Sequence, residues 1–359
     1  MLERLRPVPS DPSNAIPADD PAPGKGHAGQ VRAAIISSPR SGNTWLRRLL
    51  SSLYEVGEMA AHVPDDFDWA GLPEGCVLQI HWRPTPEFVQ RLDEHGFHVV
   101  VLARHPFDVL ISILHFALCA PSTSHWLAGE GGDETPIFGA MPRSTAFLDY
   151  ATGARAAALL SVSSSWWHQP GVHRVRYEDL VRDPYGELAR LVAGLDVGAR
   201  HRPEDAVAAN TLDKLRESQS RHSFHFWKGQ PGLWKSFLPM AEARQMAEPL
   251  AGSFAELGYA CDPDAALDAR QADANWIKLT WSELAGELQN VWELRQALRV
   301  ADDRLQAAEQ EIGTLKARLA SAAELGPLAM QAAGGLRRLS LAHPGLAATF
   351  KRIVLGQRV

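Results

Sequence analysis

Residues 31–53 constrain the fold more than any other stretch of the sequence. The apolar run VRAAIISS has a strand pattern that ends at Pro39, and TWLRRLLSSL follows shortly with apolar residues at helical spacing. Between them lies Pro-Arg-Ser-Gly-Asn, a turn whose glycine permits close backbone approach. A strand that enters such a turn and opens a helix presents backbone N–H groups to an anion. The stretch predicts a phosphate-binding loop, although it lacks the Gly-Lys-Ser/Thr ending of nucleoside triphosphatases.

Strand and helix patterns alternate along the next part of the chain. Strand patterns occupy residues 75–82, 98–104 and 171–180, and helical patterns occupy residues 84–96, 105–118 and 147–167. This alternation predicts an α/β fold, a three-layer sandwich with a central parallel sheet and a P-loop-like nucleotide-binding core. Because such folds bind ligands at the carboxyl ends of their strands, we expect His81, Arg104 and Tyr177 to lie near the first loop.

Residues 120–144 show no periodic pattern and are rich in Gly, Pro and Ser. An irregular segment of this length inside a compact domain is typical of a lid or a binding loop. Specificity usually resides on such loops, so His125, Trp126 and Phe138 are predicted to shape a substrate pocket.

The composition argues against several other classes of protein. Hydrophobic residues make up 45% of the 359 residues, which is enough for a core, and the net charge of -6 argues against a general nucleic-acid binder. No apolar run approaches the roughly 18 residues of a transmembrane helix. Cys76, Cys119 and Cys261 lie far apart and form no CxxC pair, which favours a reducing, cytoplasmic location and argues against a structural zinc.

The ends of the chain differ in character from its middle. Residues 1–30 are rich in Pro, Asp and Gly and lack the apolar core of a signal peptide, so we expect a disordered leader. Residues 31–265 are the predicted α/β domain, 266–325 a helical segment that contains a coiled coil, and 326–359 a basic amphipathic tail.

Two features of the C-terminal part suggest partners. Apolar residues from Leu294 to Leu319 alternate steps of four and three, a heptad pattern that favours a coiled coil with a copy of this chain or with another protein. The alternative is a long helix packed on its own domain. The last 29 residues carry basic side chains and no acid, which fits peripheral contact with the inner face of a membrane as well as a solvated or partner-docking end.

Four segments carry a more specific pattern: SSPRSGNTWLRRLL, VVVLARHPFDVLIS, RYEDLVRDP and WKGQPGLWKSF. In this order and at these spacings they resemble the signature segments of the sulfotransferases that use 3′-phosphoadenosine 5′-phosphosulfate (PAPS). The resemblance spans Val31 to Asp262. It implies an enzyme that moves a sulfuryl group from PAPS to an acceptor, releases 3′,5′-adenosine bisphosphate and needs no metal ion.

The resemblance implies a donor site built from the first three segments. The residues that match the family's 5′-phosphosulfate loop are Arg40, Ser41, Gly42, Asn43 and Thr44. Cytosolic members have a Lys at the first of these positions, whereas an Arg resembles the carbohydrate and protein-tyrosine branches. The family's 3′-phosphate motif, an Arg followed eight residues later by a Ser, matches Arg104 and Ser112, and the aromatic residues near the adenine match Trp45 and Tyr177.

The fourth segment departs from the family pattern. Where many members read Arg-Lys-Gly-x-x-Gly-Asp-Trp-Lys, this chain has Trp227 in place of the Arg that grips the 3′-phosphate and Leu233 in place of the Asp. Lys228 and Gly229 remain as expected donors over the cofactor. The lost charge-assisted contact costs about 1.5–3 kcal/mol of cofactor binding, unless a nearby base such as Arg221 or His225 compensates.

The resemblance also implies a catalytic group. QIHWRP matches the family's Lys-Thr-His-x-x-Pro strand end, which makes His81 the predicted general base, and a pKa near neutrality would suit that task. Gln79 replaces the family's Lys. Arg40 and Ser112 complete the predicted group, and Arg40 cannot lose its proton at neutral pH, so it would stabilise the leaving phosphate by charge. Because some carbohydrate branches use a Glu base, Asp65, Asp66 and Asp68 stay as rivals.

Other interpretations account for fewer features. His222 and His225 have an HxxH spacing without an acidic or Cys partner, so we expect no metal site. A P-loop kinase would need the missing lysine motif and an acidic strand for Mg²⁺. Trp227 and Gln79 keep open a non-catalytic scaffold with a sulfotransferase-like domain. By architectural analogy we expect the acceptor to be a hydroxyl of a glycan, such as a bacterial cell-surface saccharide, although a small phenol fits an aromatic pocket as well.

Overall fold

The computed structural model describes residues 31–118, 123–218 and 227–342. The predicted leader, Cys119, the end of the basic tail, and Arg221, His222 and His225 lie outside the described residues. The chain divides into two compact units, Met1–Leu279 and Thr280–Val359, and each is treated by itself.

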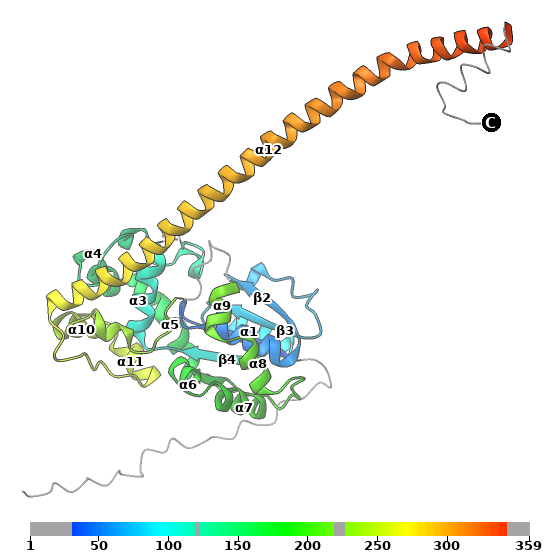
Figure 1. Ribbon diagram of the computed structural model, residues 1–359. Coiled ribbons are helices and arrows are strands. Elements are labelled where there is room, and N and C mark those ends of the chain that lie inside the picture. Colours follow the sequence, from blue (N-terminus) through cyan, green and yellow to red (C-terminus); the bar gives the residue numbers. More distant parts are fainter. Residues whose placement is uncertain (1–30, 119–122, 219–226, 343–359) are drawn as a thin grey trace, which may run out of the picture. The chain divides into compact units, whose positions relative to one another are not determined.

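The first unit is built around strands and helices that alternate along the chain (Figure 1). The strands are β1 (Arg32–Ser37), β2 (Gly57–Ala61), β3 (Cys76–Ile80), β4 (His98–Ala103) and β5 (His173–Arg176). The helices up to the middle of the unit are α1 (Asn43–Tyr54), α2 (Pro86–Glu94), α3 (Pro106–Ala117), α4 (Thr145–Ala151), α5 (Ala154–Trp167) and α6 (Tyr177–Arg182). They are followed by α7 (Pro184–Leu195), α8 (Pro203–Ala209), α9 (Leu212–Ser218), α10 (Met240–Ala247), α11 (Ala251–Leu257) and α12 (Ala269–Ala342). Short 3₁₀ turns are η2 (Pro64–Asp66), η3 (Trp126–Gly129), η4 (Thr135–Ile137) and η5 (Leu233–Ser236).

The sheet of described strands has the order β2-β3-β1-β4-β5, and every neighbouring pair is parallel. On the central strand β1, Ile36 pairs with Ile80 of β3 on one side and with Val101 of β4 on the other. From β1 the chain goes to the edge strand β2, returns to β3, crosses β1 to reach β4 and continues to β5. The connections that follow β1 and β4 therefore leave in opposite directions, and the loop after β1 lies at this reversal point. The expected parallel sheet is confirmed, and this reversal point is where such sheets bind ligands.

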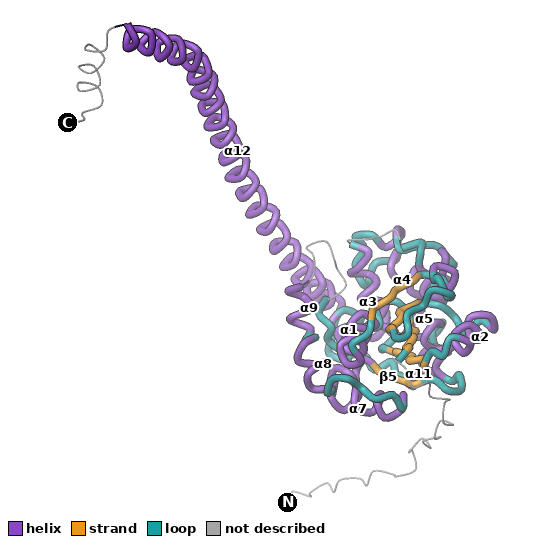
Figure 2. Tube along the Cα trace, turned by 90° about the vertical axis from the view of Figure 1, so that its right-hand side faces the viewer, coloured by secondary structure: helices purple, strands orange, loops and turns teal. Residues whose placement is uncertain are grey.

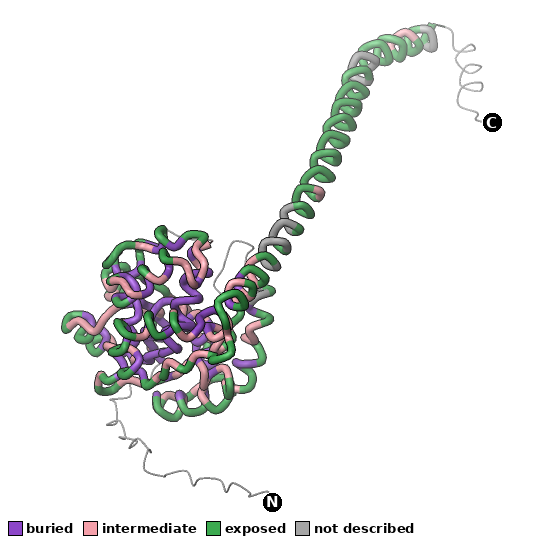
Figure 3. The backbone as a smooth tube through the Cα atoms, turned by 90° about the vertical axis from the view of Figure 1, so that its left-hand side faces the viewer, coloured by how far each residue is buried: buried purple, intermediate pink, exposed green. Residues whose placement is uncertain are grey.

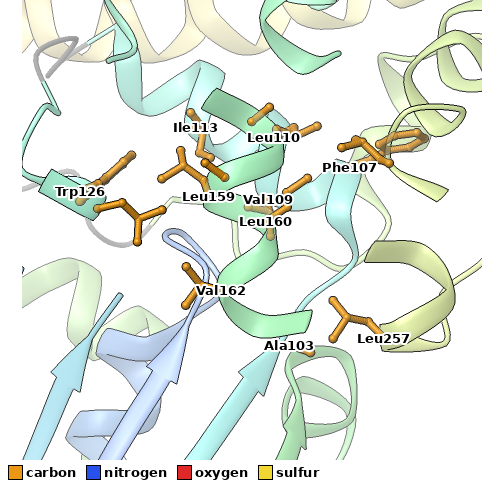
Figure 4. Packing of buried hydrophobic residues seen from close by; sticks show 14 of the residues in the cluster. Ala103, Phe107, Val109, Leu110, Ile113, Trp126, Leu159, Leu160, Val162 and Leu257 are labelled. Atoms are coloured by element: carbon orange, nitrogen blue, oxygen red, sulfur yellow. The ribbon is translucent and has the colours of Figure 1, made fainter. Parts of the chain in front are cut away.

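Side chains of the strands alternate between two apolar cores. Ala34 and Ile36 face the core that also contains buried residues of α3 and α5, whereas Ala33 and Ile35 face the core that contains buried residues of α1 and α7. Figure 2 shows helices on both sides of the strands, and Figure 4 shows Leu110 and Ile113 of α3 packing near Leu159 and Leu160 of α5. The three-layer α/β sandwich expected from the sequence is therefore present.

The structure differs from the expected elements in three places. The edge strand β2 was not predicted, because its sequence GEMAA has no β-branched residue. The helical pattern 147–167 forms two helices, α4 and α5, since the chain breaks at Thr152 and Gly153. The strand predicted over 171–180 ends at Arg176, and helix α6 begins directly at Tyr177.

A buried ion pair organises the irregular segment before α4. Arg155 Nε donates to Glu134 Oε1 at 2.9 Å, and the two side chains are 4% and 0% exposed. The Arg155 guanidinium also donates to the backbone carbonyls of Thr123, Trp126 and Glu130. The Tyr150 hydroxyl donates to the same Glu134 oxygen at 2.8 Å. One side chain of α5 thus fixes the path of a segment that has little regular structure of its own.

The beginning of α12 belongs to the first compact unit. Trp276 is 4% exposed, and its ring packs edge-on against Phe237 and Trp227 with centroid distances of 5.3 and 6.5 Å. From Thr280 onward the helix forms the second unit, whose described side chains are almost all exposed (Figure 3). Among the described residues, no helix has a stretch long and apolar enough to cross a lipid bilayer.

Breaking the buried pair should destabilise the first unit strongly. Arg155→Ala leaves Glu134 buried without its charge partner, so we expect a loss of about 3–5 kcal/mol in the free energy of unfolding, measured by urea denaturation. Arg202→Ala is the control, because its ion pair with Asp205 joins side chains that are 75% and 55% exposed. That substitution should cost less than about 1 kcal/mol. Similar losses for the two variants would contradict the assigned role of Arg155.

Candidate functional site

A cavity of about 260 Å³ lies at the carboxyl ends of the strands. It brings together residues of the loop after β1, residues that follow β3, β4 and β5, and the segment after residue 226. The predicted site residues that line it are Arg40, Gly42, Asn43, Thr44, Trp45, His81, Arg104, Ser112, Tyr177, Trp227 and Gly229. Ser41 and Lys228 are not among the lining residues, since Ser41 is fully buried behind the loop and Lys228 is exposed.

The loop after β1 adopts a backbone conformation that few residues tolerate. Arg40 has φ 65° and Gly42 has φ 102°, both in the left-handed region. A Cβ atom at position 42 would come within 2.5 Å of Tyr177 Cδ2, so only glycine fits beside this ring. Arg104 Nη1 donates to the carbonyl oxygen of Arg40 at 3.1 Å and holds the turn from the neighbouring strand. The loop ends at helix α1, which begins at Asn43 and points its N-terminal N–H groups toward the loop.

Two guanidinium groups are held in place around this loop. Arg40 Nε donates to Ser112 Oγ at 3.2 Å, and its guanidinium carbon lies 4.6 Å from the centre of the Phe116 ring. The Arg104 guanidinium carbon lies 4.6 Å from the centre of the Tyr177 ring. The sequence predicted that Arg104 and Ser112 would reach one phosphate. In the structure Ser112 contacts Arg40 directly, and Arg104 contacts the backbone of Arg40, so the three form one cluster on the cavity wall.

Polar atoms at the loop fit an anionic group. Arg104 Nε and the Ser41 hydroxyl are buried and have no hydrogen-bond partner among the described residues. Buried polar groups are normally paired, so unpaired donors beside a glycine loop and a helix N-terminus are the donor set of an anion site. Among the described residues, the cavity lining contains Arg40 and Arg104, together with Arg47, which is paired with Glu58, and it contains no Asp or Glu. A bound anion would therefore meet positive charge on several sides.

His81 follows directly after β3 and is 7% exposed at the cavity. Its Nδ1 lies 2.7 Å from the carbonyl oxygen of Ser37, which can only accept, so Nδ1 carries the proton. Nε2 then has a lone pair, and it accepts from Asn43 Nδ2 at 3.2 Å. The pKa of His81 is lowered to about 4, mainly by burial, with a smaller lowering from the positive charges of His62, His125 and Arg40 and an opposing effect of the bond to Ser37. Without an anion at the site, this pKa lies below the near-neutral range that would suit a general base.

The three acidic rivals are engaged elsewhere. Asp65 accepts from Arg91 Nη1 at 2.6 Å, Asp66 accepts from the backbone N–H groups of His62 and Val63, and Asp68 accepts from the N–H of Gly71. None of them is among the residues that line the cavity. Their hydrogen bonds stabilise the turn after β2.

Trp227, in the fourth segment, is held by aromatic packing. Its ring stacks on His115 with a centroid distance of 4.0 Å and an interplanar angle of 12°, and it also meets Trp276 edge to face. The following residues are tied to the first unit: the Tyr177 hydroxyl donates to Gly229 O at 2.8 Å, and Asp108 accepts from the backbone N–H groups of Gly232 and Trp234. The segment thus closes one side of the cavity.

The cavity also has lining residues outside the predicted donor and catalytic site. They are Arg47, Ala60, His62, Gln79, Phe116, His125, Trp126 and Leu212, and of these only His125 and Trp126 had been expected at a substrate pocket. The rings of His62 and His125 are 4.1 Å apart, and those of Phe116 and Trp126 stack at 5.6 Å. Phe138, which was expected with them, is 61% exposed and is not a lining residue. Phe116 lies one helical turn after Ser112 and could have been found by its spacing, whereas His62 depended on recognising β2.

The low pKa of His81 makes a testable contribution to stability. The unfolded chain binds a proton at His81 near pH 6.5 and the folded chain only near pH 4. The contribution of the neutral, buried His81 to the free energy of unfolding is therefore fully present above pH 6.5 and is lost as the pH falls toward 4. His81→Asn should flatten the dependence of the unfolding free energy on pH in this window by up to about 1.4 kcal/mol per pH unit. Urea titrations at several pH values measure it. His201→Asn, which removes an exposed ring, is the control, and an unchanged slope in His81→Asn would contradict the assignment.

Comparisons with known proteins identify the family of the chain. The model of the sulfotransferase domain family matches residues 31–257. Cytosolic sulfotransferase 15 of Arabidopsis thaliana is 22% identical over 266 residues, which is 59% of this chain and 69% of that protein. Among solved structures, mouse sulfotransferase SULT7A1 complexed with PAP is 14% identical with a TM-score of 0.47, covering 63% of this chain and 84% of its own. A retinol dehydratase structure with androsterone and inactive cofactor PAP is 15% identical with a TM-score of 0.42, covering 62% and 80%. Because the match to the family model spans more than half of this chain, the chain belongs to the sulfotransferase domain family and is an enzyme of the PAPS-dependent class.

Proposed function

We propose that this protein transfers a sulfuryl group from PAPS to a hydroxyl group of a carbohydrate acceptor, with His81 as general base and Arg40 at the leaving phosphate. The observation that carries the proposal is the fixed tautomer of His81. Because Ser37 O accepts from Nδ1, the lone pair of Nε2 lies at the cavity shared with Arg40. A proton acceptor and a permanent cation on one wall are what sulfuryl transfer to a hydroxyl requires.

The donor would be held by the residues of the first cluster. The N–H groups at the start of α1 and the side chains of Arg40, Asn43 and Thr44 would bind the 5′-phosphosulfate. Arg104 and Ser112 would bind the 3′-phosphate, with Arg104 Nε unpaired among the described residues and thus able to donate. Trp45 and Tyr177 would border the adenine, and their rings meet edge to face at 6.2 Å.

The far end of the donor would meet the fourth segment. Trp227 would contribute an aromatic surface there, while Gly229 and the exposed Lys228 would lie along the same edge. The Ser41 hydroxyl, which is buried and has no hydrogen-bond partner among the described residues, would be available to donate to the 5′-phosphosulfate. Since position 227 holds Trp and not Arg, the far end of the donor would meet an aromatic surface where many family members have a charged contact.

The three catalytic residues would act at different atoms during the transfer. When bound, PAPS supplies an electrophilic sulfur, so that the acceptor oxygen forms a new bond to sulfur while the bond from sulfur to the 5′-phosphate oxygen breaks. His81 Nε2 would exchange its hydrogen bond from Asn43 for the proton of the attacking hydroxyl. Arg40 would carry the charge that develops on the leaving phosphate, and Ser112 would orient its guanidinium by the bond at 3.2 Å. The negative charge of a bound donor favours the protonated form of His81 and so raises its pKa toward the working range.

The acceptor end of the cavity supports a ring-shaped substrate. The stacked rings of Phe116 and Trp126 offer an apolar face, and His62, His125 and Gln79 surround it with polar atoms. A flat apolar face bordered by hydrogen-bonding groups suits a sugar ring, which has apolar C–H groups on its faces and hydroxyl groups at its edge. We place this chemistry in the cytoplasm, since the relative from Arabidopsis is a cytosolic sulfotransferase.

Ligand-induced stabilisation tests the donor. The product 3′,5′-adenosine bisphosphate (PAP), at about 100 times its dissociation constant, should stabilise the folded protein by about 2.7 kcal/mol, whereas ATP with Mg²⁺ should not. Thermal melting in each ligand measures the effect. A response to ATP and Mg²⁺ alone would instead indicate a kinase, and no response to PAP would contradict the donor site and favour a non-catalytic scaffold.

Removing the base tests the mechanism separately from binding. His81→Ala should keep the stabilisation by PAP but lower the transfer rate at least about 100-fold. Transfer is measured with ³⁵S-labelled PAPS against a panel of oligosaccharides and phenols. Asp68→Ala is the matched control, since its carboxylate accepts from the backbone N–H of Gly71 away from the cavity, and it should retain transfer. Transfer that survives in His81→Ala would disprove the base, and transfer to phenols alone would disprove the carbohydrate acceptor.

A further inference from the structure

The second unit is a helix that presents an apolar stripe, and no other described residue of this unit covers it. Its described residues are almost all exposed (Figure 3), and the stripe residues Leu298, Leu305, Ile312 and Leu319 are 63%, 59%, 51% and 74% exposed. Water contact at a regular row of large apolar side chains is unfavourable, and a single helix gains little stability from its own sequence. The row therefore indicates a missing partner.

The stripe has the periodicity of a coiled-coil seam. Counting in heptads, the four stripe residues fall at positions a, and the d positions are Leu294, Ala301, Ala308 and Leu315. The two alanines make the seam thin. Two helices can approach closely over alanine layers, whereas three or four would leave voids there. The seam thus fits two strands.

The charges beside the seam distinguish one arrangement of two identical helices. In a parallel, in-register pair, a g residue meets the e residue five positions further along the other helix. Arg304 at g then meets Glu309 at e, and Glu311 at g meets Lys316 at e, and symmetry repeats both contacts. The remaining g positions of this stretch, Ala297 and Arg318, meet no like charge. All charged g–e contacts in this arrangement are attractive.

Antiparallel arrangements of two copies bring like charges together instead. In the register with the greatest overlap, e residues meet e residues, so that Asp302 meets Glu309 and Arg295 meets Lys316, and only the g–g contact of Arg304 with Glu311 is attractive. If one helix is shifted by one heptad in one direction, Asp302 meets Asp302 of the second helix and Arg304 meets Arg304. If it is shifted in the other direction, Glu309 meets Glu309 of the second helix. Such contacts oppose these alternatives.

We propose that the helix over Leu294–Leu319 forms a parallel, in-register two-stranded coiled coil with a second copy of this chain. The dimer rests on the stripe, the alanine layers and the charge pattern, and it is independent of the sulfotransferase chemistry. Glu311 and Lys316 are suited to a test, because neither has a charged residue three or four positions away in its own helix. Substitutions there change contacts between helices and little else.

A charge exchange tests both the partner and the direction. Glu311→Lys and Lys316→Glu each convert attractive g–e contacts into repulsive ones, so each should raise the dissociation constant of the dimer about ten-fold or more. The double variant Glu311→Lys/Lys316→Glu should dimerise like the unaltered chain. An equimolar mixture of the two single variants should form mixed dimers. Sedimentation of the full-length protein over a range of concentrations measures all four.

Disulfide trapping tests the register. Leu305→Cys lies at an a position, where the same residue of each copy faces the other, and it should cross-link on mild oxidation. Gln310→Cys is the control at an outward position and should not. A full-length chain that stays monomeric at all concentrations, single variants with unchanged affinity, or equal cross-linking at both positions would overturn the proposal.

Discussion

The candidate site depends on a turn that the backbone does not favour. Arg40 in the left-handed region costs about 1–2 kcal/mol, and Gly42 must lie against the ring of Tyr177. The turn persists because neighbouring strands hold it: Arg104, after β4, bonds to the Arg40 carbonyl, and Tyr177, after β5, packs on Gly42. Three strand ends are thereby fixed to one another. Strain held by surrounding structure is common where a protein binds or reacts.

The sequence predicted those features of the site that depend on the direction of the strands. Arg104, His81 and Tyr177 could be assigned to one edge because each comes directly after an apolar strand, and parallel strands end on the same side. The sequence did not reveal His62, because it follows the unpredicted strand β2. It also gave no access to the pKa of His81, which depends on burial created by segments distant in the sequence. Local patterns predict positions, whereas electrostatic properties require the packed structure.

Trp227 illustrates how one exchange alters its surroundings. An arginine at this position would reach a phosphate through its own charge, without a neighbour behind it. The tryptophan instead lies between His115 and the buried Trp276, so its position depends on the first turns of α12. This dependence gives a physical reason for the compact unit to continue to Leu279, beyond the end of the family match at residue 257. An aromatic stack, and not a charge, fixes the side chain at this position.

The buried position of His81 beside the anion loop would also govern the fate of a proton accepted in the proposed transfer. Ser37 is the last residue of the strand that leads into the anion loop, so the ring and the loop share one rigid support. With no anion present, burial disfavours the charged imidazolium. A proton accepted during transfer would therefore leave His81 for water once the anionic product departs. The same burial that makes this histidine a weak base at rest would restore it for the next turnover.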